Sequence, residues 1–297
     1  MILVTGGTGF IGSAVLNHLT SKGEKVRLLI HPTLNSPRLP KGIAVETALC
    51  SFSDERGLLA AMKGIDIIFH LASAEREEKQ VDLNLVDVQG TNAIVSAASR
   101  GNVKRIIYSS HIGADKKSIF PSLKAKSLAE EIIQNSDLNY TIFRSSAIFG
   151  PGDHFTESIR DHLLSSVGIF PIPGSSEITL QPLWIQDYLT CLFLSLDDDR
   201  MVRNLITVGG GEYFNFRHFV KIIMNKIKVS RILFPIAPAY LRTINVWFGG
   251  VGRGLPYSNN WLDFYAADRT CPLDTLPKIF RLVPARFEKK IDYLTNY

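Results

Sequence analysis

Short aliphatic runs alternate with stretches of helical periodicity through the first half of the chain. Residues 1–5 form the first run, and apolar residues at helical spacing follow it up to Gly23, which is expected to end that helix in a left-handed conformation. Runs typical of buried strands occupy residues 26–30, 44–48, 65–71, 105–109 and 140–143. Further helices are predicted over about residues 54–63, 86–100 and 121–133, the first with Asp54 as its N-cap. Because strands and helices alternate, the pattern predicts an α/β fold with a parallel sheet.

The regular alternation weakens after residue 145, where glycine and proline interrupt the segment FRSSAIFGPGDHF. We therefore expect a Rossmann-type doubly wound parallel sheet over residues 1–145 and 176–210. A smaller C-terminal lobe for a substrate or partner is expected over residues 146–175 and 211–297. With 297 residues, 45% of them hydrophobic, the chain can bury cores of this size.

Composition excludes several classes of protein. No apolar run reaches the roughly 18 residues that a membrane-spanning helix requires, and the first residues lack the basic leader of a signal peptide. Cys50, Cys191 and Cys271 are far apart and form no Cys-x-x-Cys pair, so we expect buried thiols rather than disulfides or a metal site. These features predict a cytoplasmic protein without a bound metal and without a nucleic-acid partner.

The turn after the first predicted strand is a candidate phosphate-binding site. It reads Thr5-Gly6-Gly7-Thr8-Gly9-Phe10-Ile11-Gly12. In such a turn Gly6 permits the tight bend, Gly9 lets the backbone approach a pyrophosphate, and Gly12 lets the helix pack close to the strand. Backbone N–H groups and the positive helix end then hold the anion. Placed between a strand and a helix, the motif predicts a bound nicotinamide dinucleotide.

The charge near the end of the second strand distinguishes the two nicotinamide dinucleotides. An acidic residue there would bind the ribose diol of NAD, but none occurs between Lys25 and Glu46. His31, Arg38 and Lys41 lie in this interval and suit the 2′-phosphate of NADP. We therefore favour NADP(H) over NAD(H), and solvated loop charges are the alternative explanation for the basic residues.

Several further segments form a recognisable combination. They are Phe69-His70-Leu71-Ala72, Gly90-Thr91-Asn92, Tyr108-Ser109-Ser110, FRSSAIFGPGDHF, Gln181-Pro182-Leu183-Trp184-Ile185-Gln186-Asp187 and Val208-Gly209-Gly210-Gly211. Together with TGGTGFIG they resemble the extended, atypical short-chain dehydrogenase/reductases of the NAD-dependent epimerase/dehydratase superfamily. The branch that they resemble is the one related to the accessory NADPH-binding subunit of respiratory complex I, and the resemblance covers most of the chain.

This resemblance implies a reactive centre in which a tyrosine precedes a lysine by four residues on one helix. The lysine lowers the pKa of the phenol from about 10, so that the tyrosine acts as a general acid or base. Lys126 aligns with the lysine, but Ser122 stands at the tyrosine, and a serine hydroxyl is a poor substitute for proton transfer. Ser109 or Ser110 matches the carbonyl-polarising hydroxyl, and the adjacent His111 is an alternative acid.

The resemblance and the glycine-rich turn together imply a set of cofactor contacts. They fall on Thr5, Gly6, Gly7, Thr8, Gly9, Phe10, Ile11, Gly12, His31, Arg38, Ser51, Phe52, Leu71, Ala72, Ser109 and Lys126. Two positions depart from the family: Asp87 stands where relatives often have asparagine, and Ser51 where an aspartate often approaches the adenine. Because Lys126 remains, we predict that Ser122→Tyr alone restores part of the lost chemistry.

The end of the chain is basic and apolar. Residues 200–297 carry a net charge of +9 and residues 1–199 one of −4, within the total of +5. Residues 231–256, RILFPIAPAYLRTINVWFGGVGRGLP, predict either a lobe helix over the cofactor cleft or a surface for a membrane-associated protein partner or an anionic lipid surface.

Two main functions remain open, beside a regulator in which the cofactor controls protein contacts without a membrane role. We favour a dinucleotide-binding protein that lacks the catalytic tyrosine and acts as a structural, assembly or redox-sensing component, peripheral to a membrane where the basic lobe docks. The alternative is an oxidoreductase or epimerase on a small-molecule or sugar-nucleotide substrate, with His111, a serine or water as proton donor.

Overall fold

The computed structural model describes residues 1–32, 44–74, 82–174, 178–237, 239–241, 243, 262 and 268–295. The chain forms two compact units. The first contains Met1–Arg144 and Leu189–Thr207, and the second contains Ser145–Tyr188 and Val208–Tyr297. The first unit is therefore completed by a segment that follows part of the second in the sequence.

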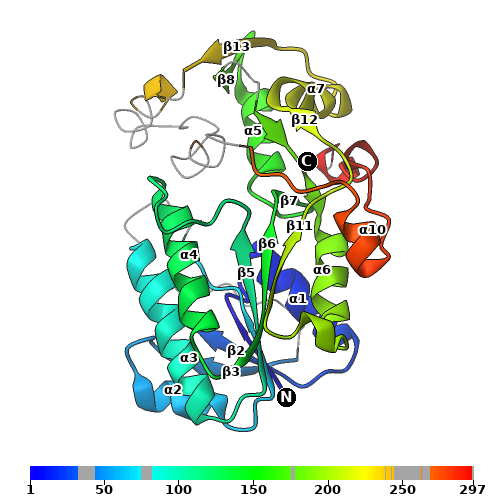
Figure 1. Ribbon diagram of the computed structural model, residues 1–297. Helices are drawn as coiled ribbons and strands as arrows, with labels where there is room; N and C mark the ends of the chain where they lie inside the picture. Colours follow the sequence, from blue (N-terminus) through cyan, green and yellow to red (C-terminus); the bar gives the residue numbers. More distant parts are fainter. Residues whose placement is uncertain are drawn as a thin grey trace. The chain divides into compact units, whose positions relative to one another are not determined.

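Within the described residues, seven strands form one sheet in the order β11-β6-β5-β4-β1-β2-β3 (Figure 1). The strands are β1 (Ile2–Thr5), β2 (Val26–Ile30), β3 (Glu46–Leu49), β4 (Ile67–His70), β5 (Arg105–His111), β6 (Asn139–Ser145) and β11 (Asn204–Val208). β1 pairs in parallel with β2 on one side and with β4 on the other. The direction of strand addition reverses beside β1, which is the switch point of a doubly wound sheet. The predicted Rossmann-type α/β fold is confirmed.

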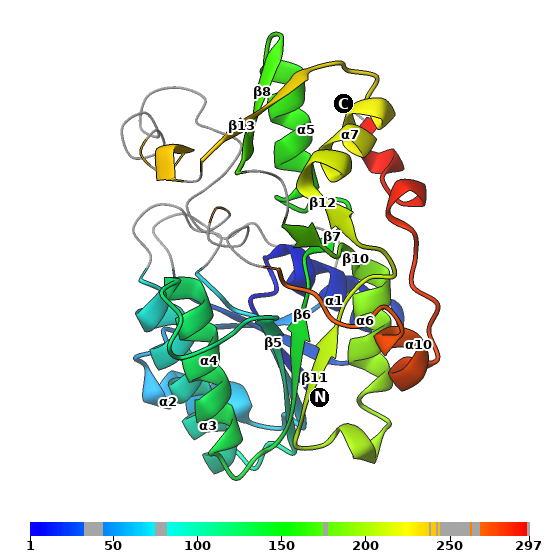
Figure 2. The same cartoon turned by 45° about the horizontal axis from the view of Figure 1, so that its top comes forward.

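Helices cover both faces of this sheet, as Figures 1 and 2 show. One face carries α2 (Glu55–Met62), α3 (Gly90–Arg100) and α4 (Pro121–Gln134), and the other carries α1 (Phe10–Ser21) and, from Leu189 on, α6 (Ile185–Leu194). The rings of His18 and Phe193 stack with centroids 4.1 Å apart and join α1 to α6. Leu3, Ile68 and Ile106 have no exposed surface, so the central strands form the core that fixes their carboxyl ends.

The ends of the helices, the burial of one strand and the state of the cysteines were also predicted from the sequence. Asp54 caps α2 by accepting a hydrogen bond from the amide of Gly57 at 2.9 Å, and Gly23 has a φ of +74°, as expected. The helix predicted from residue 86 begins earlier, with a π-helical turn, η1 (Asn84–Gln89), that continues into α3. The prediction of a buried strand near residues 44–48 was wrong in burial, because β3 is the edge strand and most of its side chains are exposed. The three cysteines are buried free thiols, as predicted.

The second unit is built around an aromatic core. Its elements are β7 (Ile148–Phe149), α5 (Thr156–Ser165), β8 (Ile169–Pro173), β9 (Thr179–Leu180), β10 (Leu183–Trp184), β12 (Phe214–Asn215), α7 (Phe216–Lys226), β13 (Ile232–Ile236), α10 (Thr275–Phe280), and the short 3-10 turns η3 (Phe287–Lys289) and η4 (Asp292–Thr295). Phe219 stacks on Phe155 at 5.0 Å and on Phe287 at 4.4 Å, which joins α5, α7 and η3.

For the basic, apolar segment that starts at residue 231, a lobe helix was one of two predictions. The segment does not begin as a helix. Residues 232–236 form β13, which pairs in parallel with β8, because branched and aromatic residues at alternating positions suit a strand. Most of the segment after residue 237 lies outside the described residues. Among the helices that the structure describes, none has the length and apolarity needed to cross a bilayer.

Candidate cofactor-binding site

The glycine-rich turn connects the carboxyl end of β1 to the start of α1, at the switch point of the sheet. Gly6 has a φ of +69°, and a Cβ atom there would lie 2.5 Å from backbone atoms of Leu71 and Ala72. A Cβ atom at Gly12 would lie 2.1 Å from the carbonyl oxygen of Gly6. Both positions therefore require glycine, and the turn packs directly against the chain that leaves β4. Thr8 is exposed on this turn.

The start of α1 fits the pyrophosphate of a dinucleotide. Its N-cap is Gly9, which has no side chain to occupy the helix end, and its first turn has no acidic residue. The first intrahelical bond runs from the amide of Ser13 to the carbonyl of Gly9. The amides of Phe10, Ile11 and Gly12 therefore have no partner within the helix, and the helix dipole favours an anion beside them.

A chain of hydrogen bonds links the glycine-rich turn to the helix that follows β4. Thr5 Oγ1 accepts the two amides after β4 and lies 2.7 Å from His70 Nδ1. His70 Nε2 lies 2.9 Å from Thr91 Oγ1, whose proton goes to the carbonyl of Asp87 at 2.5 Å. Since Thr91 must accept from the imidazole, His70 carries its proton on Nε2 and accepts from Thr5 on Nδ1.

His70 is a structural residue, and its side chain is completely buried. Burial lowers its pKa to about 3, and the positive charge of Lys126 acts in the same direction. The imidazole is therefore neutral over the physiological range and serves to fix the ends of β1 and β4.

The carboxyl ends of β2 and β3 form the expected adenosine side of the site. The ring of His31, which is exposed, lies 5.2 Å from the ring of Phe52, and the hydroxyl of Ser51 lies 2.9 Å from that of Ser53. Arg38 and Lys41, which we also expected near the cofactor, lie outside the described residues.

The lysine aligned with the family's catalytic lysine is held by a carboxylate. Lys126 Nζ lies 3.1 Å from Asp87 Oδ1, and the side chains are 4% and 0% exposed. Asp87 Oδ2 accepts the amide of Ala74 at 2.9 Å. Lys126 Nζ also lies 5.4 Å from the centroid of the buried Tyr108 ring, a cation–π contact.

The serine aligned with the carbonyl-polarising hydroxyl is also bound to a carboxylate. Ser110 donates to Glu130 Oε1 at 2.5 Å, and Arg144 donates to both oxygens of Glu130 at 2.9 and 2.6 Å. This hydrogen bonding raises the pKa of Arg144. A serine hydroxyl has one proton to give, so Ser110 directs it at Glu130 in this structure.

The remaining predicted reactive residues lie around these two groups. Ser122 is buried in the first turn of α4, Ser109 is buried in β5, and His111 is half-buried at the end of β5. In the sequence, Asp87 stood out only as a departure from the family, and Glu130 had no predicted role. The sequence contained a signal for Glu130, because this acidic residue is one helical turn after Lys126 on the face of α4 that carries buried apolar residues.

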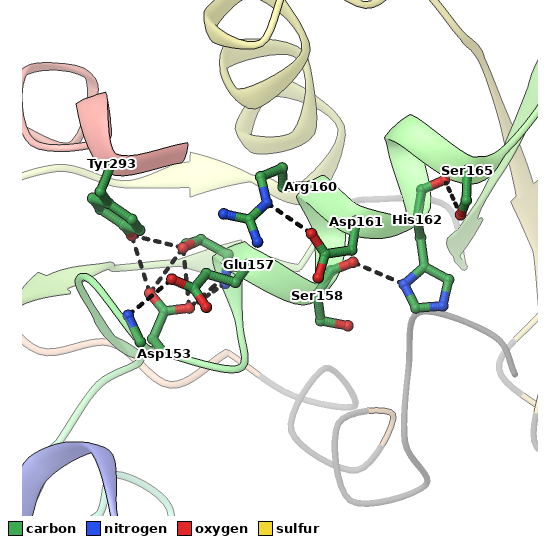
Figure 3. A network of polar contacts seen from close by, with 10 residues as sticks. Asp153, Glu157, Ser158, Arg160, Asp161, His162, Ser165 and Tyr293 are labelled. Atoms are coloured by element: carbon green, nitrogen blue, oxygen red, sulfur yellow. Dashed lines mark hydrogen bonds and ion pairs between the residues drawn. The ribbon is translucent and has the colours of Figure 1, made fainter. Parts of the chain in front are cut away.

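The segments of the second unit that carried the family resemblance hold its own backbone together. Asp153 accepts the amide of Thr156 at 2.6 Å and the hydroxyl of Tyr293 at 3.1 Å (Figure 3). Burial, with the charge of Asp153 as a further cause, raises the pKa of Tyr293, so this phenol stays neutral and anchors η4. Gln181 likewise accepts the amide of Cys271 at 2.8 Å, and Asp187 that of Ala285 at 2.7 Å.

A parallel doubly wound sheet with a glycine-rich turn at its switch point defines a Rossmann-type dinucleotide-binding protein. The chain belongs to the NAD(P)H-binding family, which matches residues 6–154. Among the described residues, no group of three His, Cys, Asp or Glu side chains is placed to hold a metal ion.

Comparison with known proteins agrees with the resemblance seen in the sequence. Photosystem II assembly factor Ycf39 of Cyanophora paradoxa is 30% identical over 50% of this chain and 46% of its own. Subunit 9 of the NADH dehydrogenase [ubiquinone] 1 alpha subcomplex of Mus musculus is 27% identical over 92% of this chain and 72% of its own. The chain thus spans about half the length of the first relative. The dTDP-glucose 4,6-dehydratase DesIV of Streptomyces venezuelae, solved with NAD and TYD, has the same fold, with a TM-score of 0.76 at 17% identity over 99% of this chain and 95% of that one.

Proposed function

We propose that this chain binds NADPH and acts as a structural or assembly component of a membrane-associated protein complex, without reducing a substrate. One observation carries the proposal: the two side chains aligned with the family's lysine and serine, Lys126 and Ser110, each bind a buried carboxylate. The phenol that would transfer the proton is replaced by Ser122. The glycine-rich turn has the geometry of a pyrophosphate site, whereas the proton-transfer groups are absent or bound to carboxylates.

Two of the sequence relatives support the non-enzymatic part of this proposal. One is named as an assembly factor of photosystem II and the other as a subunit of NADH dehydrogenase, and both names refer to large complexes. The partner proposed here is likewise a protein complex, located at a membrane and contacted through the basic C-terminal lobe.

The preference for NADPH is supported by the positions of the nearest acidic residues. Glu46 lies at the start of β3, at the opposite end from the cofactor edge, and binds Arg27 there with an N–O distance of 2.8 Å. Asp54 is used as the cap of α2. Neither carboxylate is placed to bind the ribose diol of NAD, and His31 adds a basic group at the end of β2.

A turnover assay tests the proposal. The purified chain is mixed with NADPH and a panel of aldehydes, ketones and quinones, and we expect NADPH binding with oxidation no faster than in buffer. Rapid oxidation that is lost in Lys126→Met would refute the structural role and favour the oxidoreductase. In detergent extracts of cells, the chain is expected to migrate on native gels with a membrane complex, and migration only as the free protein would refute the proposed partner.

A further inference from the structure

We propose that Asp87 is a counter-ion that neutralises the charge of Lys126 and so prevents this lysine from activating a proton donor beside the cofactor. Carbonyl reduction has then been lost through two positions, 87 and 122, rather than through position 122 alone. This inference rests on the proposed function, because it explains how the lysine can be kept without the reaction. Asp87 is a positioning residue in this role, since it acts through Lys126.

Each oxygen of the Asp87 carboxylate has a polar contact. Oδ1 lies 3.1 Å from Lys126 Nζ, and Oδ2 accepts the amide of Ala74 at 2.9 Å. Its backbone carbonyl accepts the hydroxyl of Thr91, which belongs to the hydrogen-bond chain through His70. The carboxylate thus has two contacts and the backbone of Asp87 a third, and the π-helical turn η1 carries the side chain into the interior.

Two other described groups that act on Lys126 carry no negative charge. His70 on β4 is a neutral imidazole, and Tyr108 on β5 presents its ring. Glu130, one turn further along α4, forms a bidentate ion pair with Arg144 and accepts from Ser110. Among the residues that the structure describes, Asp87 from η1 is the carboxylate that forms an ion pair with the Lys126 ammonium.

This pairing changes what a lysine can do for a phenol at position 122. A free ammonium one helical turn away stabilises the phenolate and lowers its pKa by about 1 to 3 pH units. A carboxylate 3.1 Å from that ammonium largely cancels its field, because the two opposite charges then act as a dipole. Ser122→Tyr alone is therefore expected to leave the phenol with an ordinary pKa and little activity, which revises the expectation from sequence.

The test measures the pKa of the phenol introduced by Ser122→Tyr, using NMR of isotope-labelled tyrosine in the full chain without cofactor. We expect a value of about 10 or above in Ser122→Tyr, and a value about 1 to 3 pH units lower when Asp87→Asn is added. Asp137→Asn, an equal change of charge on the exposed loop after α4, is the matched control and should have no effect. A pKa well below 10 in Ser122→Tyr alone, or no change on adding Asp87→Asn, overturns the proposal.

A second measurement does not depend on accommodating a phenol in a buried position. Asp87→Asn alone should bind NADPH about fivefold more tightly, because the lysine is released toward the anionic ligand. A merely structural role for Asp87 predicts weaker binding, so unchanged or weaker binding in a folded Asp87→Asn protein also overturns the proposal. The NMR result requires no cofactor, whereas turnover by the wild-type chain would refute the proposed function without affecting that result.

Discussion

The neutral, buried His70 makes the first unit sensitive to acid. Its pKa is about 3 in the folded chain and about 6.5 in an unfolded one. Between these values the unfolded chain binds a proton that the folded chain cannot, so the free energy of unfolding is fully retained above pH 6.5 and falls as the pH is lowered toward 3. From pH 7.5 to pH 5.0 the loss is RT ln(1 + 10^1.5), about 2 kcal/mol, because the folded state binds almost no proton at pH 5.

The assay compares the wild-type chain with His70→Gln, which removes the titrating group. Hydrogen exchange of peptides that contain β1 and β4, measured by mass spectrometry and corrected for intrinsic rates, reports the stability of the first unit alone. The variant is less stable at every pH, but its loss between pH 7.5 and 5.0 should be smaller than that of the wild type by about 2 kcal/mol. Equal losses in the two proteins would refute the neutral imidazole and the hydrogen-bond chain built on it.

Three further outcomes are expected. Gly6→Ala should abolish NADPH binding and destabilise the first unit by about 1 to 3 kcal/mol, whereas Gly23→Ala, where no described atom lies near the added Cβ, should keep binding in the same fluorescence titration. NADPH should bind more tightly than NADH at fixed ionic strength, and His31→Asp should reduce that ratio; equal affinities in the wild type would show that the basic residues face solvent. Tyr293→Phe should lower the free energy of unfolding of the second unit by about 1 to 2 kcal/mol, measured by tryptophan fluorescence, and Tyr240→Phe, at an exposed position, should not.

Much of the fold was predictable because its signals are local. The apolar runs and the glycine-rich turn define β1, α1 and their connection without any knowledge of distant contacts. The exposure of β3 was not predictable in this way, since an edge strand and a central strand differ only in their neighbours. Residues 232–236 show the same limit, because their pairing with β8 involves a segment more than sixty positions earlier.

In the candidate site, too, the local features were predictable from the sequence and the contacts between distant residues were not. The glycines at 6 and 12 could be assigned from spacing, and their geometry agrees with the requirement for a residue without Cβ. The partners of Lys126 and Ser110 could not, because Asp87 and Glu130 reach them through the packing of η1 and α4 against the sheet. Resemblance identified the position where the phenol is missing, but not the carboxylates that hold the groups that remain.

The return of the chain to complete the first unit has a consequence for how the protein is made. β11 follows the segment 145–188 of the second unit, yet it closes the sheet beside β6. Thr141 donates to the carbonyl of Met201 at 2.8 Å, and Arg105 to that of Leu196 at 3.2 Å. During synthesis on the ribosome, the nascent chain up to β6 therefore has an open strand edge. The side chains of Thr141 and Arg105 are then donors whose acceptors have not yet been translated. The glycine-rich turn is translated early, but the unit that carries it is complete only when Leu189–Thr207, which follow the segment 145–188, have emerged from the ribosome.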